Sequence, residues 1–596
     1  MSEIEILGVS ALFHDSSVTY IKDSKVVAAL QEERFSKIKF DERLPELSID
    51  ALVKNFDFDP KNLTALVFYD KPILKFERII ENLIYTSPKN FQFAFNSLPI
   101  WLKDKLYTES KLRKLVKGDY KIFYVPHHIS HISSSFYPSD LDRAAFIVND
   151  GVGEWETTTI GVVDDKKINI IYSIDYPHSL GMFYSTFTYL AGFKVNSGEY
   201  KLMGLAPYGL PRYVSLIKEN LIDIKEDGSY RLNMKFFDYQ NGLRMCGKRM
   251  EQLFGVKIRK DGEPLNEKYA DIASSVQVVL EEILIKMALR LKKESKEKNL
   301  IIGGGVGLNC VANSKVLEAY QPEKFFIQPA SGDAGGSLGA ALYVANRYYG
   351  LNIRNCQNYS FLGTEYSDEQ IEESLKKLNG VYKKINFPEI VASEEIIKKK
   401  VVGWFQGKME YGPRALGNRS ILGDPTDPEM QRIMNLKIKF RESFRPLAPA
   451  VLEDKFDLIF KKGYPTFYML TVCEIKDEFK NTHEQIKHDF KILRKSITQF
   501  PSVVHSDFTS RVQLVSKESN PLFYSLINHF YEKTGCPMVI NTSFNVRGQP
   551  IVESPEDAFK TFIETDIDVL IIGNFILKKE EQVRKRGDFK IEKRND

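Results

Sequence analysis

The sequence is poor in cysteine and has no cysteine pair at the spacing of a metal-binding or redox motif. Its five cysteines among 596 residues are widely separated, at Cys246, Cys310, Cys356, Cys473 and Cys536. This pattern excludes a disulfide framework and a thiolate zinc site. It is typical of a protein kept in a reducing compartment.

A long apolar run, a basic N-terminus and a large excess of one charge are also lacking. The first residues, Met1–Glu5, are acidic, and no apolar run approaches the ~20 residues that span a bilayer. The 83 Lys and Arg against 79 Asp and Glu leave a net charge of +4, too small over this length to favour nucleic acid as a partner. We therefore expect a soluble, cytoplasmic protein with no membrane and no nucleic acid among its partners.

The length and composition are those of a globular protein of more than one domain, with 43% hydrophobic and 27% charged residues. We predict a first domain over residues 1–352 and a linker over 353–396, which is polar apart from one helix at Asp368–Leu378. A second domain over 397–596 is predicted to begin with the strand Val401–Phe405.

An order of strand, loop and hairpin occurs twice in the first domain. It is predicted at Ile4–Glu33 and again at Ala144–Ile174, and aligning the two hairpin turns places Asp150 on Gly8. Two α/β halves that each open in this way predict a duplicated ATP-binding fold of the actin, sugar-kinase and heat-shock ATPase type. Two unrelated hairpins are the alternative.

Three of the nine histidines lie within the five residues His127–His131. On a helix His127 and His131 are one turn apart on the same face, whereas the middle histidine, His128, points away. The apolar run that follows predicts a buried strand with Asp150 at its carboxyl end, beside a glycine-rich turn. The pattern indicates a metal site next to a phosphate, and buried hydrogen-bonded histidines are the alternative.

Two further turns in the first domain are rich in glycine. The loop Ser197–Gly209 would place Glu199 and Lys201 on the same side of an extended chain. The predicted strand Leu300–Ile302 runs into a glycine-rich turn that ends at Asn309, where backbone N–H groups favour an anion.

Asp333 lies where a predicted strand, Lys324–Gln328, passes into a helix of small residues. Such a position lies at the edge of an α/β cleft. Aspartate is also a favoured N-cap, which is the simpler role.

The second domain carries basic residues in short loops with Gly, Pro, Ser or Asn. These residues are Arg414, Arg419, Lys437, Lys439, Arg441, Arg445, Arg511 and Arg547. Their spacing is not helical, which disfavours a solvated charged helix face. Rigid loops of this kind favour a binding site for phosphate or carboxylate.

The sequence resembles the NodU/cephamycin-type O-carbamoyltransferases over nearly its whole length. The resemblance rests on Gly8, His14-Asp15, Glu32–Ser36, His127–His131, Asp150–Trp155, Glu199–Leu205, Gly304–Asn309, Ser331–Asp333, Gly412–Gly417, Phe444–Pro446 and Asn541–Asn545. One departure is Phe508, where the family tends to have glycine.

The resemblance implies an ATPase-type first domain and a YrdC-like, twisted α/β second domain. In such enzymes the second domain makes carbamoyladenylate from carbamoyl phosphate and Mg-ATP. The first domain then transfers the carbamoyl group to a hydroxyl of a small-molecule acceptor. The resemblance implies a divalent metal, with Fe(II) expected and Mn or Zn as alternatives, and it leaves a homodimer open.

Roles for individual residues are implied in the same way. The metal ligands would be His127, His131, Asp150 and Asp333, and His14 would be the catalytic base for the acceptor hydroxyl. The nucleotide would lie against Gly151, Gly153, Gly304, Gly305 and Asn309. The acceptor or the adenylate would contact Glu199 and Lys201. Carbamoyl phosphate and ATP would bind at Arg414, Lys439, Arg445, Arg511, Asn541 and Ser543.

Three alternatives use less of the sequence. A sugar kinase would need only the first domain. A tRNA-modifying enzyme that transfers a threonylcarbamoyl group would need a basic face for RNA, which the near-neutral charge does not provide. A non-catalytic scaffold would not bind a metal or a nucleotide tightly. The acceptor itself has no signature, because the segments expected to contact it, Phe35–Pro45 and Ile73–Arg113, carry no recognisable motif.

Overall fold

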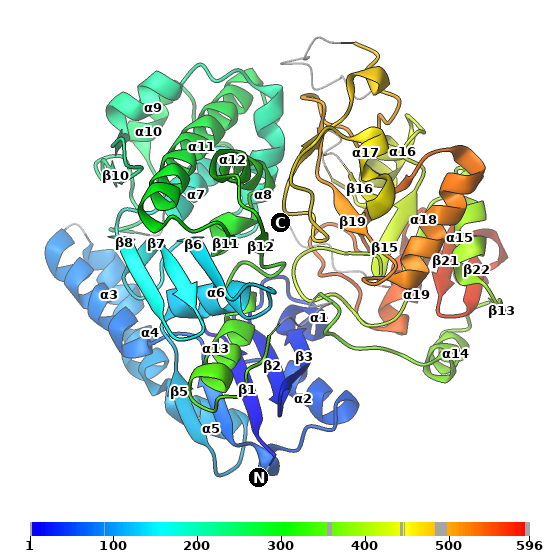
Figure 1. The fold of residues 1–596 in the computed structure, drawn as a ribbon, viewed down its shortest axis with the longest axis horizontal. Coiled ribbons are helices and arrows are strands. Elements are labelled where there is room, and N and C mark those ends of the chain that lie inside the picture. The colour runs from blue at the N-terminus through cyan, green and yellow to red at the C-terminus, as the bar shows by residue number, and fades with distance from the viewer. Residues whose placement is uncertain are drawn as a thin grey trace. The chain divides into compact units, whose positions relative to one another are not determined.

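The chain forms two compact units (Figure 1). A computed structural model describes residues 3–88, 90–242, 244–260, 262–354, 360–441, 445, 447–482 and 497–589. Unit 1 comprises Met1–Glu32 and Phe40–Cys356, and unit 2 comprises Glu33–Lys39 and Gln357–Asp596.

Unit 1 contains two five-stranded sheets of identical topology, ordered β3-β2-β1-β4-β5 and β8-β7-β6-β11-β12. In each sheet an antiparallel hairpin is followed by two parallel strands. The strands of the first sheet are β1 (Glu5–Ser10), β2 (Ser17–Lys22), β3 (Lys25–Gln31), β4 (Ala65–Phe68) and β5 (Lys121–Tyr124). Those of the second are β6 (Arg143–Asn149), β7 (Glu156–Asp164), β8 (Ile168–Asp175), β11 (Leu300–Gly303) and β12 (Phe325–Ile327). The predicted duplication is confirmed.

The two repeats differ in the loop that follows their first strand. Gly8 pairs with Thr19 in the first hairpin, and Phe146 pairs with Gly161 in the second. Thr19 and Gly161 lie equally far from their hairpin turns, so Gly8 is equivalent to Phe146. The predicted alignment of Asp150 with Gly8 is therefore wrong. The loop of the second repeat is longer, and an alignment of the hairpin turns alone does not reveal this.

Two helices connect the sheets of unit 1. α6 (His127–Phe136) follows β5, α13 (Ala334–Arg347) follows β12, and the two helices pack against each other. A Cβ on Gly339 would lie 1.8 Å from the carbonyl oxygen of Ser130, and one on Gly8 would lie 2.1 Å from that of Ser337. The missing side chains let α13 lie directly on α6 and on β1.

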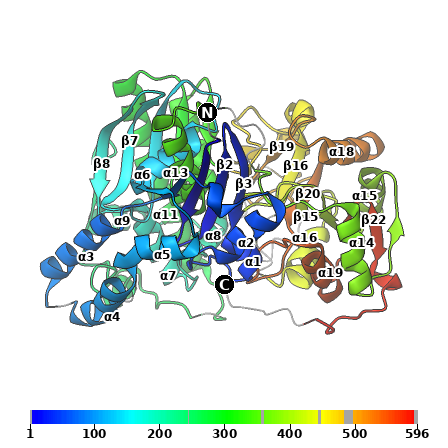
Figure 2. The same ribbon diagram turned by 90° about the horizontal axis from the view of Figure 1, so that it is seen from below.

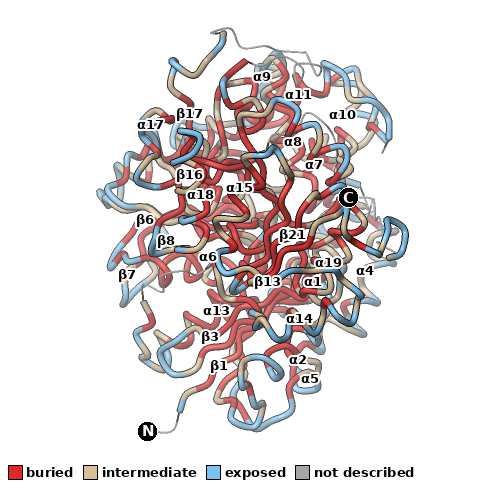
Figure 3. The backbone as a smooth tube through the Cα atoms, turned by 90° about the vertical axis from the view of Figure 1, so that its right-hand side faces the viewer, coloured by how far each residue is buried: buried red, intermediate tan, exposed pale blue. Residues whose placement is uncertain are grey.

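Unit 1 has further helices and a small hairpin of strands. The helices are α2 (Glu46–Asn55), α3 (Pro72–Thr86), α4 (Phe91–Lys103), α5 (Thr108–Leu115), α7 (Leu180–Leu190), α8 (Glu199–Leu205), α9 (Val214–Asn220), α10 (Lys248–Phe254), α11 (Glu267–Ser295) and α12 (Cys310–Tyr320). The strands are β9 (Ile222–Ile224) and β10 (Tyr230–Leu232). Buried segments gather in the two sheets and in α6 and α13 (Figure 3).

Unit 2 is built on one mixed sheet, ordered β13-β22-β21-β14-β15-β20-β16-β19. These strands are β13 (Lys383–Lys384), β14 (Val402–Phe405), β15 (Arg419–Gly423), β16 (Ala448–Leu452), β19 (Gln513–Val515), β20 (Met538–Ser543), β21 (Val569–Ile572) and β22 (Phe575–Lys578). A separate pair is formed by β17 (Cys473–Glu474) and β18 (Thr509–Ser510). This mixed α/β sheet is the architecture expected for a YrdC-like domain.

The helices of unit 2 are α14 (Asp368–Lys377), α15 (Pro388–Ile397), α16 (Met430–Arg432), α17 (Phe456–Ile459), α18 (Pro521–Thr534) and α19 (Pro555–Glu564). Residues 360–396, expected to be a linker, contribute α14, β13 and most of α15 to this unit. α14 coincides with the one helix predicted there.

Unit 2 also includes Glu33–Lys39, which come more than 300 residues before its other part. α1 (Glu32–Ser36) carries the buried Arg34, whose Nη2 donates to the carbonyl oxygen of Gly412 at 2.7 Å. Lys37 forms an ion pair with Asp557. These contacts make unit 2 discontinuous in sequence.

Within the described ranges, none of the helices combines the length and the apolar composition that crossing a bilayer requires.

Candidate metal centre and anion site

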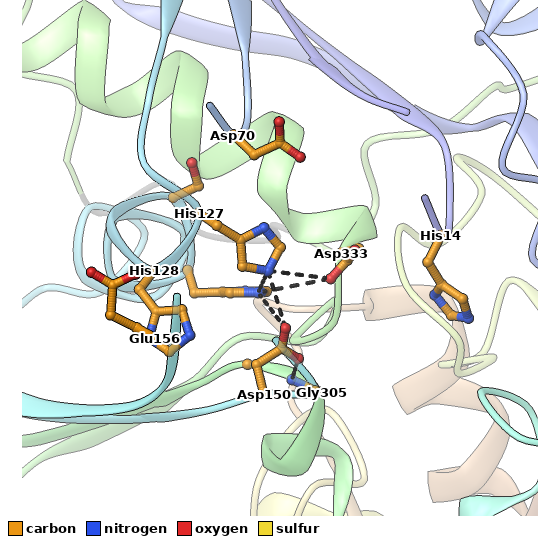
Figure 4. Close-up of polar contacts among 12 residues, drawn as sticks. His14, Asp70, His127, His128, Asp150, Glu156, Gly305 and Asp333 are labelled. Carbon is orange, nitrogen blue, oxygen red and sulfur yellow. Dashed lines mark hydrogen bonds and ion pairs between the residues drawn. The ribbon is translucent and has the colours of Figure 1, made fainter. Parts of the chain in front are cut away.

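Four side chains converge in unit 1 (Figure 4). His127 and His131 lie one turn apart at the start of α6, Asp150 follows β6, and Asp333 precedes α13. One ligand atom from each side chain lies within 4.8 Å of the other three. The structure thus brings together the four residues expected to bind a metal.

The distances within this cluster suit a metal ion. His127 Nε2 lies 3.0 Å from Asp150 Oδ2, 3.1 Å from His131 Nε2 and 3.6 Å from Asp333 Oδ1. Ligand atoms about 2.0–2.2 Å from one ion lie roughly 3–3.6 Å from each other. Two imidazoles with two carboxylates form a donor set for a borderline divalent metal. These residues could therefore hold such an ion.

Burial and charge act in opposite directions on the cluster. Burial and repulsion from His127 lower the pKa of His131 to about 4. Burial alone would raise the pKa of Asp150, but the hydrogen bond from His127 and the nearby His131 hold it well below its usual range. At neutral pH, His131 is neutral and Asp150 is ionised, and these are the forms that bind metals.

Asp333 occupies the N-cap position of α13 without capping it. Within the described chain its carboxylate makes no bond to the first turn of the helix. Tyr69 instead donates its hydroxyl to Asp333 Oδ2 at 3.3 Å, and Ser10 Oγ donates to the backbone oxygen of Asp333 at 2.9 Å. The simpler N-cap role is wrong, because packing of α13 turns the carboxylate toward the histidines.

The buried Glu154 fixes the start of the histidine helix. Both of its carboxylate oxygens accept the N–H of His127, at 2.9 and 3.1 Å, and Oε1 also accepts the N–H of Lys71 at 2.8 Å. Asp150 is oriented in a similar way by the N–H of Gly305, which donates to Oδ1 at 2.9 Å. No role for Glu154 is predicted from the sequence, although it lies inside the segment Asp150–Trp155.

The glycines expected at the nucleotide lie on two turns beside the cluster. Gly151 and Gly153 are in the loop after β6, and Gly304 and Gly305 follow β11. Gly304 has φ +82°, and a Cβ there would come within 2.3 Å of the carbonyl oxygen of Asn149. This position therefore requires glycine.

Asn309 is engaged in packing. Its side chain caps α12 by accepting the N–H of Ala312 at 3.0 Å. The amide also exchanges hydrogen bonds with Gln277 of α11, at 3.0 and 3.2 Å. These bonds fix the position of α12 against α11.

His14, in the loop after β1, is paired with its neighbour Asp15. His14 Nδ1 lies 3.2 Å from Asp15 Oδ2, and the ring stacks on Phe40. Nε2 is buried and has no hydrogen-bond partner among the residues described. Burial opposes a charge here, but Asp15, Asp333 and Glu199 outweigh it and raise the pKa of His14 to about 10. In the view of Figure 4, Asp333 lies between His14 and the His127 ring.

The predicted extended loop around Glu199 and Lys201 is a helix, α8, so the expectation that they share a side is wrong. Residues two apart on a helix point in different directions. Glu199 accepts the hydroxyl of Ser185 at 2.7 Å and the N–H of Asn196 at 3.0 Å. Lys201 is buried, with Nζ 5.8 Å from the centre of the Phe193 ring.

In unit 2, Lys439 and Ser543 are in direct contact. The buried Lys439 follows the π-helical turn Ile433–Ile438, and its Nζ donates to Ser543 O at 2.6 Å and to Ser543 Oγ at 3.0 Å. Asn545 Oδ1 accepts from both side chains. A buried ammonium attracts an anion more strongly than an exposed one, because screening by water is weaker there.

Asn541 connects two arginine loops. Its Nδ2 donates to Gln513 Oε1 at 2.7 Å and to the carbonyl oxygen of Ala415, next to Arg414, at 3.2 Å. Gln513 lies two residues after Arg511 at the start of β19. The backbones of both arginine loops are therefore held near the end of β20. Gln513 is not predicted from the sequence.

Arg445 is held through its backbone. Its carbonyl oxygen accepts the side-chain amides of Gln431 at 3.1 Å and Asn435 at 2.8 Å. Its neighbours Phe444 and Pro446, part of the segment on which the resemblance rests, lie outside the described residues.

Phe508, where the family tends to have glycine, has a backbone conformation that favours glycine. Its φ is +64°, in the left-handed region, and its side chain is buried with Lys480 Nζ 4.8 Å from the ring centre. A residue with a Cβ costs about 1–2 kcal/mol in this conformation. The turn before Arg511 forms at that cost.

A duplicated ATPase-type unit with a cluster that could hold a metal ion is joined to an α/β unit with a buried lysine and loop arginines, a combination that suits an enzyme acting on phosphorylated substrates. Family models make this specific. Carbamoyltransferase N-terminus matches residues 5–342, and Carbamoyltransferase C-terminus matches residues 393–579. The chain belongs to the carbamoyltransferase family and is a transferase.

Relatives match over nearly the full length. The chain is 43% identical over 612 residues to the uncharacterized protein sll1178 of Synechocystis sp., with 98% of each chain covered. It is 30% identical over 581 residues to nodulation protein NolNO of Sinorhizobium fredii, covering 96% of this chain and 80% of that protein. Among solved structures, HypF of T. kodakarensis matches with a TM-score of 0.32 and 16% identity, over 59% of this chain and 50% of that chain.

Proposed function

We propose that this transferase is an ATP-dependent O-carbamoyltransferase that acts in two steps. In unit 2, carbamoyl phosphate and water give carbamate and phosphate. A carbamate oxygen then attacks the α-phosphorus of ATP, so that carbamoyladenylate forms and pyrophosphate leaves. In unit 1, a hydroxyl oxygen of a small-molecule acceptor attacks the carbamoyl carbon, AMP leaves, and the hydroxyl proton passes to His14.

The observation that carries this proposal is the cluster of His127, His131, Asp150 and Asp333 beside glycine turns, in a chain of the carbamoyltransferase family. A divalent ion at this cluster, with Fe(II) expected, would supply Lewis acidity and positive charge for a phosphate group. The glycine turns after β6 and β11 lie beside Asp150, and turns of this kind let the phosphate oxygens of an adenylate approach the backbone closely.

His14 suits the role of base by its geometry. Asp15 holds Nδ1, so Nε2 is the nitrogen that is left to accept a proton. The pKa of about 10 keeps His14 protonated at neutral pH. His14 becomes a better base when Asp333 is engaged by a cation, because one of the charges that raise its pKa is then offset.

Unit 2 suits the first step because its basic residues are held in rigid surroundings. Carbamoyl phosphate is a small, doubly charged anion, and carbamate is short-lived in water. The buried ammonium of Lys439 beside Ser543, and arginine forks from the loops of Arg414, Arg445 and Arg511, would neutralise such anions without reorganisation.

The test is product release. With ATP, carbamoyl phosphate and Fe(II), Mn(II) or Zn(II), the protein should release pyrophosphate and phosphate, and AMP should follow when an acceptor is present. A mass-spectrometric screen of alcohols for products heavier by one carbamoyl group would identify the acceptor. If neither pyrophosphate nor phosphate appears with any of these metals, with or without acceptors, the proposal is wrong.

A further inference from the structure

α3 and α4 expose many large apolar side chains. Twenty large hydrophobic residues are exposed in the described chain, and nine of them lie between Ile73 and Tyr107. Isolated apolar residues on a surface are ordinary, but a contiguous group marks an interaction site. The concentration of exposed apolar side chains in one short segment of unit 1 therefore indicates a surface that binds a partner.

The exposed residues follow the helical period. On α4, Phe91, Phe95 and Leu102 are spaced i, i+4 and i+11, which places them on one face, and they are 75%, 72% and 53% exposed. On α3, Ile73 and Ile84 are also eleven residues apart, and they are 74% and 73% exposed. The two helices thus each present an apolar stripe, and Figure 3 shows exposed and intermediate colours along α4.

The other side of this segment is anchored. Trp101 is only 5% exposed, and its ring lies 5.8 Å from the rings of both Phe13 and Phe76. The residue before α3, Lys71, donates its N–H to Glu154, which also holds the start of the histidine helix. The exposed stripes are therefore the outer face of a docked element, at the edge of unit 1 (Figure 2).

The same segment has a surplus of positive charge. Residues 71–119 contain ten Lys and Arg against five Asp and Glu, a surplus of five, whereas the whole chain has a net charge of +4. Lys103, Lys114 and Lys117 are exposed. On α4, Lys103 is the one charged residue among thirteen, a composition that is otherwise found in buried or membrane-associated helices.

We propose that residues 71–119 bind peripherally to the surface of an anionic lipid bilayer. Apolar stripes with Phe and Leu, together with exposed lysines, are the features by which helices lie in the headgroup region of a membrane. A second copy of this chain is a poorer occupant, because a symmetric interface would place two basic segments against each other. The expectation of no membrane partner is based on the lack of a long apolar run. Peripheral binding does not need such a run, because no segment crosses the bilayer.

The experiment is flotation of the full-length protein with vesicles of phosphatidylcholine, with and without phosphatidylserine. Binding is expected only with phosphatidylserine and should weaken as salt is raised. Changing Phe91→Glu and Phe95→Glu together should weaken it by at least roughly tenfold. Changing Lys114→Gln and Lys117→Gln together should weaken it by roughly 25-fold, since each basic residue contributes about fivefold.

The matched control is Phe387→Glu, a change at another phenylalanine that is 60% exposed but lies in unit 2. It should leave vesicle binding unchanged, and all variants should keep the melting temperature of the parent. Absence of binding to phosphatidylserine vesicles at low salt would overturn the proposal, as would an equal loss in the control. So would a dimer in light scattering that the Phe91→Glu and Phe95→Glu pair converts to monomers, because a second copy would then cover the face.

Discussion

His14 shows how neighbouring charges set the chemistry of a single side chain. Burial alone would keep this imidazole neutral, but the carboxylates around it reverse the outcome and raise its pKa to about 10. A base must be deprotonated when it acts. If His14 is the base, as we propose, the carboxylate that orients its ring, Asp15, also limits the fraction of the enzyme that is ready to react at neutral pH.

Carbamoyl transfer should accordingly become faster as pH rises toward the pKa of His14. His14→Gln should remove this pH dependence and slow transfer by about 10²–10⁴-fold. Asp15→Asn removes the charge that contributes most to the raised pKa, so the rising limb should move to lower pH. The measurement is the rate of AMP release from supplied carbamoyladenylate against pH. An unshifted limb in Asp15→Asn would contradict the assignment of the base.

The two neighbouring histidines of α6 allow a matched test of the metal centre. His127 belongs to the cluster, whereas His128 is equally buried but bonds to Thr159 at 2.9 Å. His127→Ala should abolish binding of one divalent ion, measured by calorimetry, and carbamoyl transfer with it. His128→Ala should retain the ion. Carbamoyladenylate formation in unit 2 should survive both changes, and equal loss of the ion in both variants would show that α6, not the ligand, has been damaged.

Lys439 and Lys437 provide the same comparison in unit 2. Lys439 is buried against Ser543, whereas Lys437 is exposed two residues away. Lys439→Ala should reduce pyrophosphate release by at least about tenfold, because a charge-assisted contact is worth roughly 1.5–3 kcal/mol. Lys437→Ala should change it little. Transfer from supplied carbamoyladenylate should be unaffected in both variants. Loss of that activity in Lys439→Ala would contradict the assignment of adenylate formation to unit 2 and of transfer to unit 1.

At the scale of helices and strands, the metal cluster depends on how closely α6 and α13 approach. Two of the four residues of the cluster are on α6 and one precedes α13, so the distances between them follow from the packing of these helices. Gly339 permits the contact, since a Cβ there would lie 1.8 Å from the carbonyl oxygen of Ser130. In an ordinary helix the same change from glycine to alanine is stabilising by up to about 1 kcal/mol.

Gly339→Ala should therefore destabilise the protein, by about 1–3 kcal/mol, and weaken metal binding as the helices separate. The control is Gly204→Ala in α8, where a Cβ would meet nothing within 4 Å. That change should be neutral or stabilising by up to about 1 kcal/mol. Urea unfolding and calorimetric titration with the metal measure both effects. Stabilisation of equal size in the two variants would contradict the close contact.

The elements that the sequence predicts well are those with a local cause. The hairpins follow from their polar turns, and α14 coincides with the helix predicted at Asp368–Leu378. The glycines around α8 predict an extended loop. The hydrogen bonds that fix Glu199 in the helix cannot be predicted from the sequence. The sequence around Asp333 fits both an N-cap and a metal ligand. The packing of α13, which turns the carboxylate toward the histidines, distinguishes these two roles.

The supporting residues of the site were the hardest to predict. Glu154 acts on His127, and Gln513 acts on Asn541, across 27 and 28 residues of sequence respectively. No spacing rule connects residues so far apart. Asp15 is different, because it is adjacent to His14 and its pairing could have been inferred from that adjacency alone.

On the scale of the whole molecule, the division into units does not follow the order of the chain. Arg34 is buried in unit 2, where it donates to the carbonyl oxygen of Gly412, although the sequence on both sides of its segment belongs to unit 1. Arg34→Ala should destabilise unit 2 by about 1–3 kcal/mol. Arg43→Ala removes the exposed partner of the buried Asp41 in unit 1 and should leave the stability of unit 2 unchanged.

Hydrogen exchange in the loop around Gly412 is the measurement that separates these variants. Exchange there should accelerate in Arg34→Ala and not in Arg43→Ala, while metal binding in unit 1 is retained in both. Unchanged exchange around Gly412 in Arg34→Ala would show that the early segment does not stabilise unit 2.

The discontinuity of unit 2 also has a consequence for synthesis on the ribosome. Residues 33–39 emerge more than 300 residues before the rest of their unit begins to appear. At about 5–20 residues per second this delay is roughly 15–65 s. The nascent chain can form the first hairpin, β2 and β3, during that interval, but Arg34 and Lys37 remain without Gly412 and Asp557. The N-terminal region is thus completed last, although it is made first.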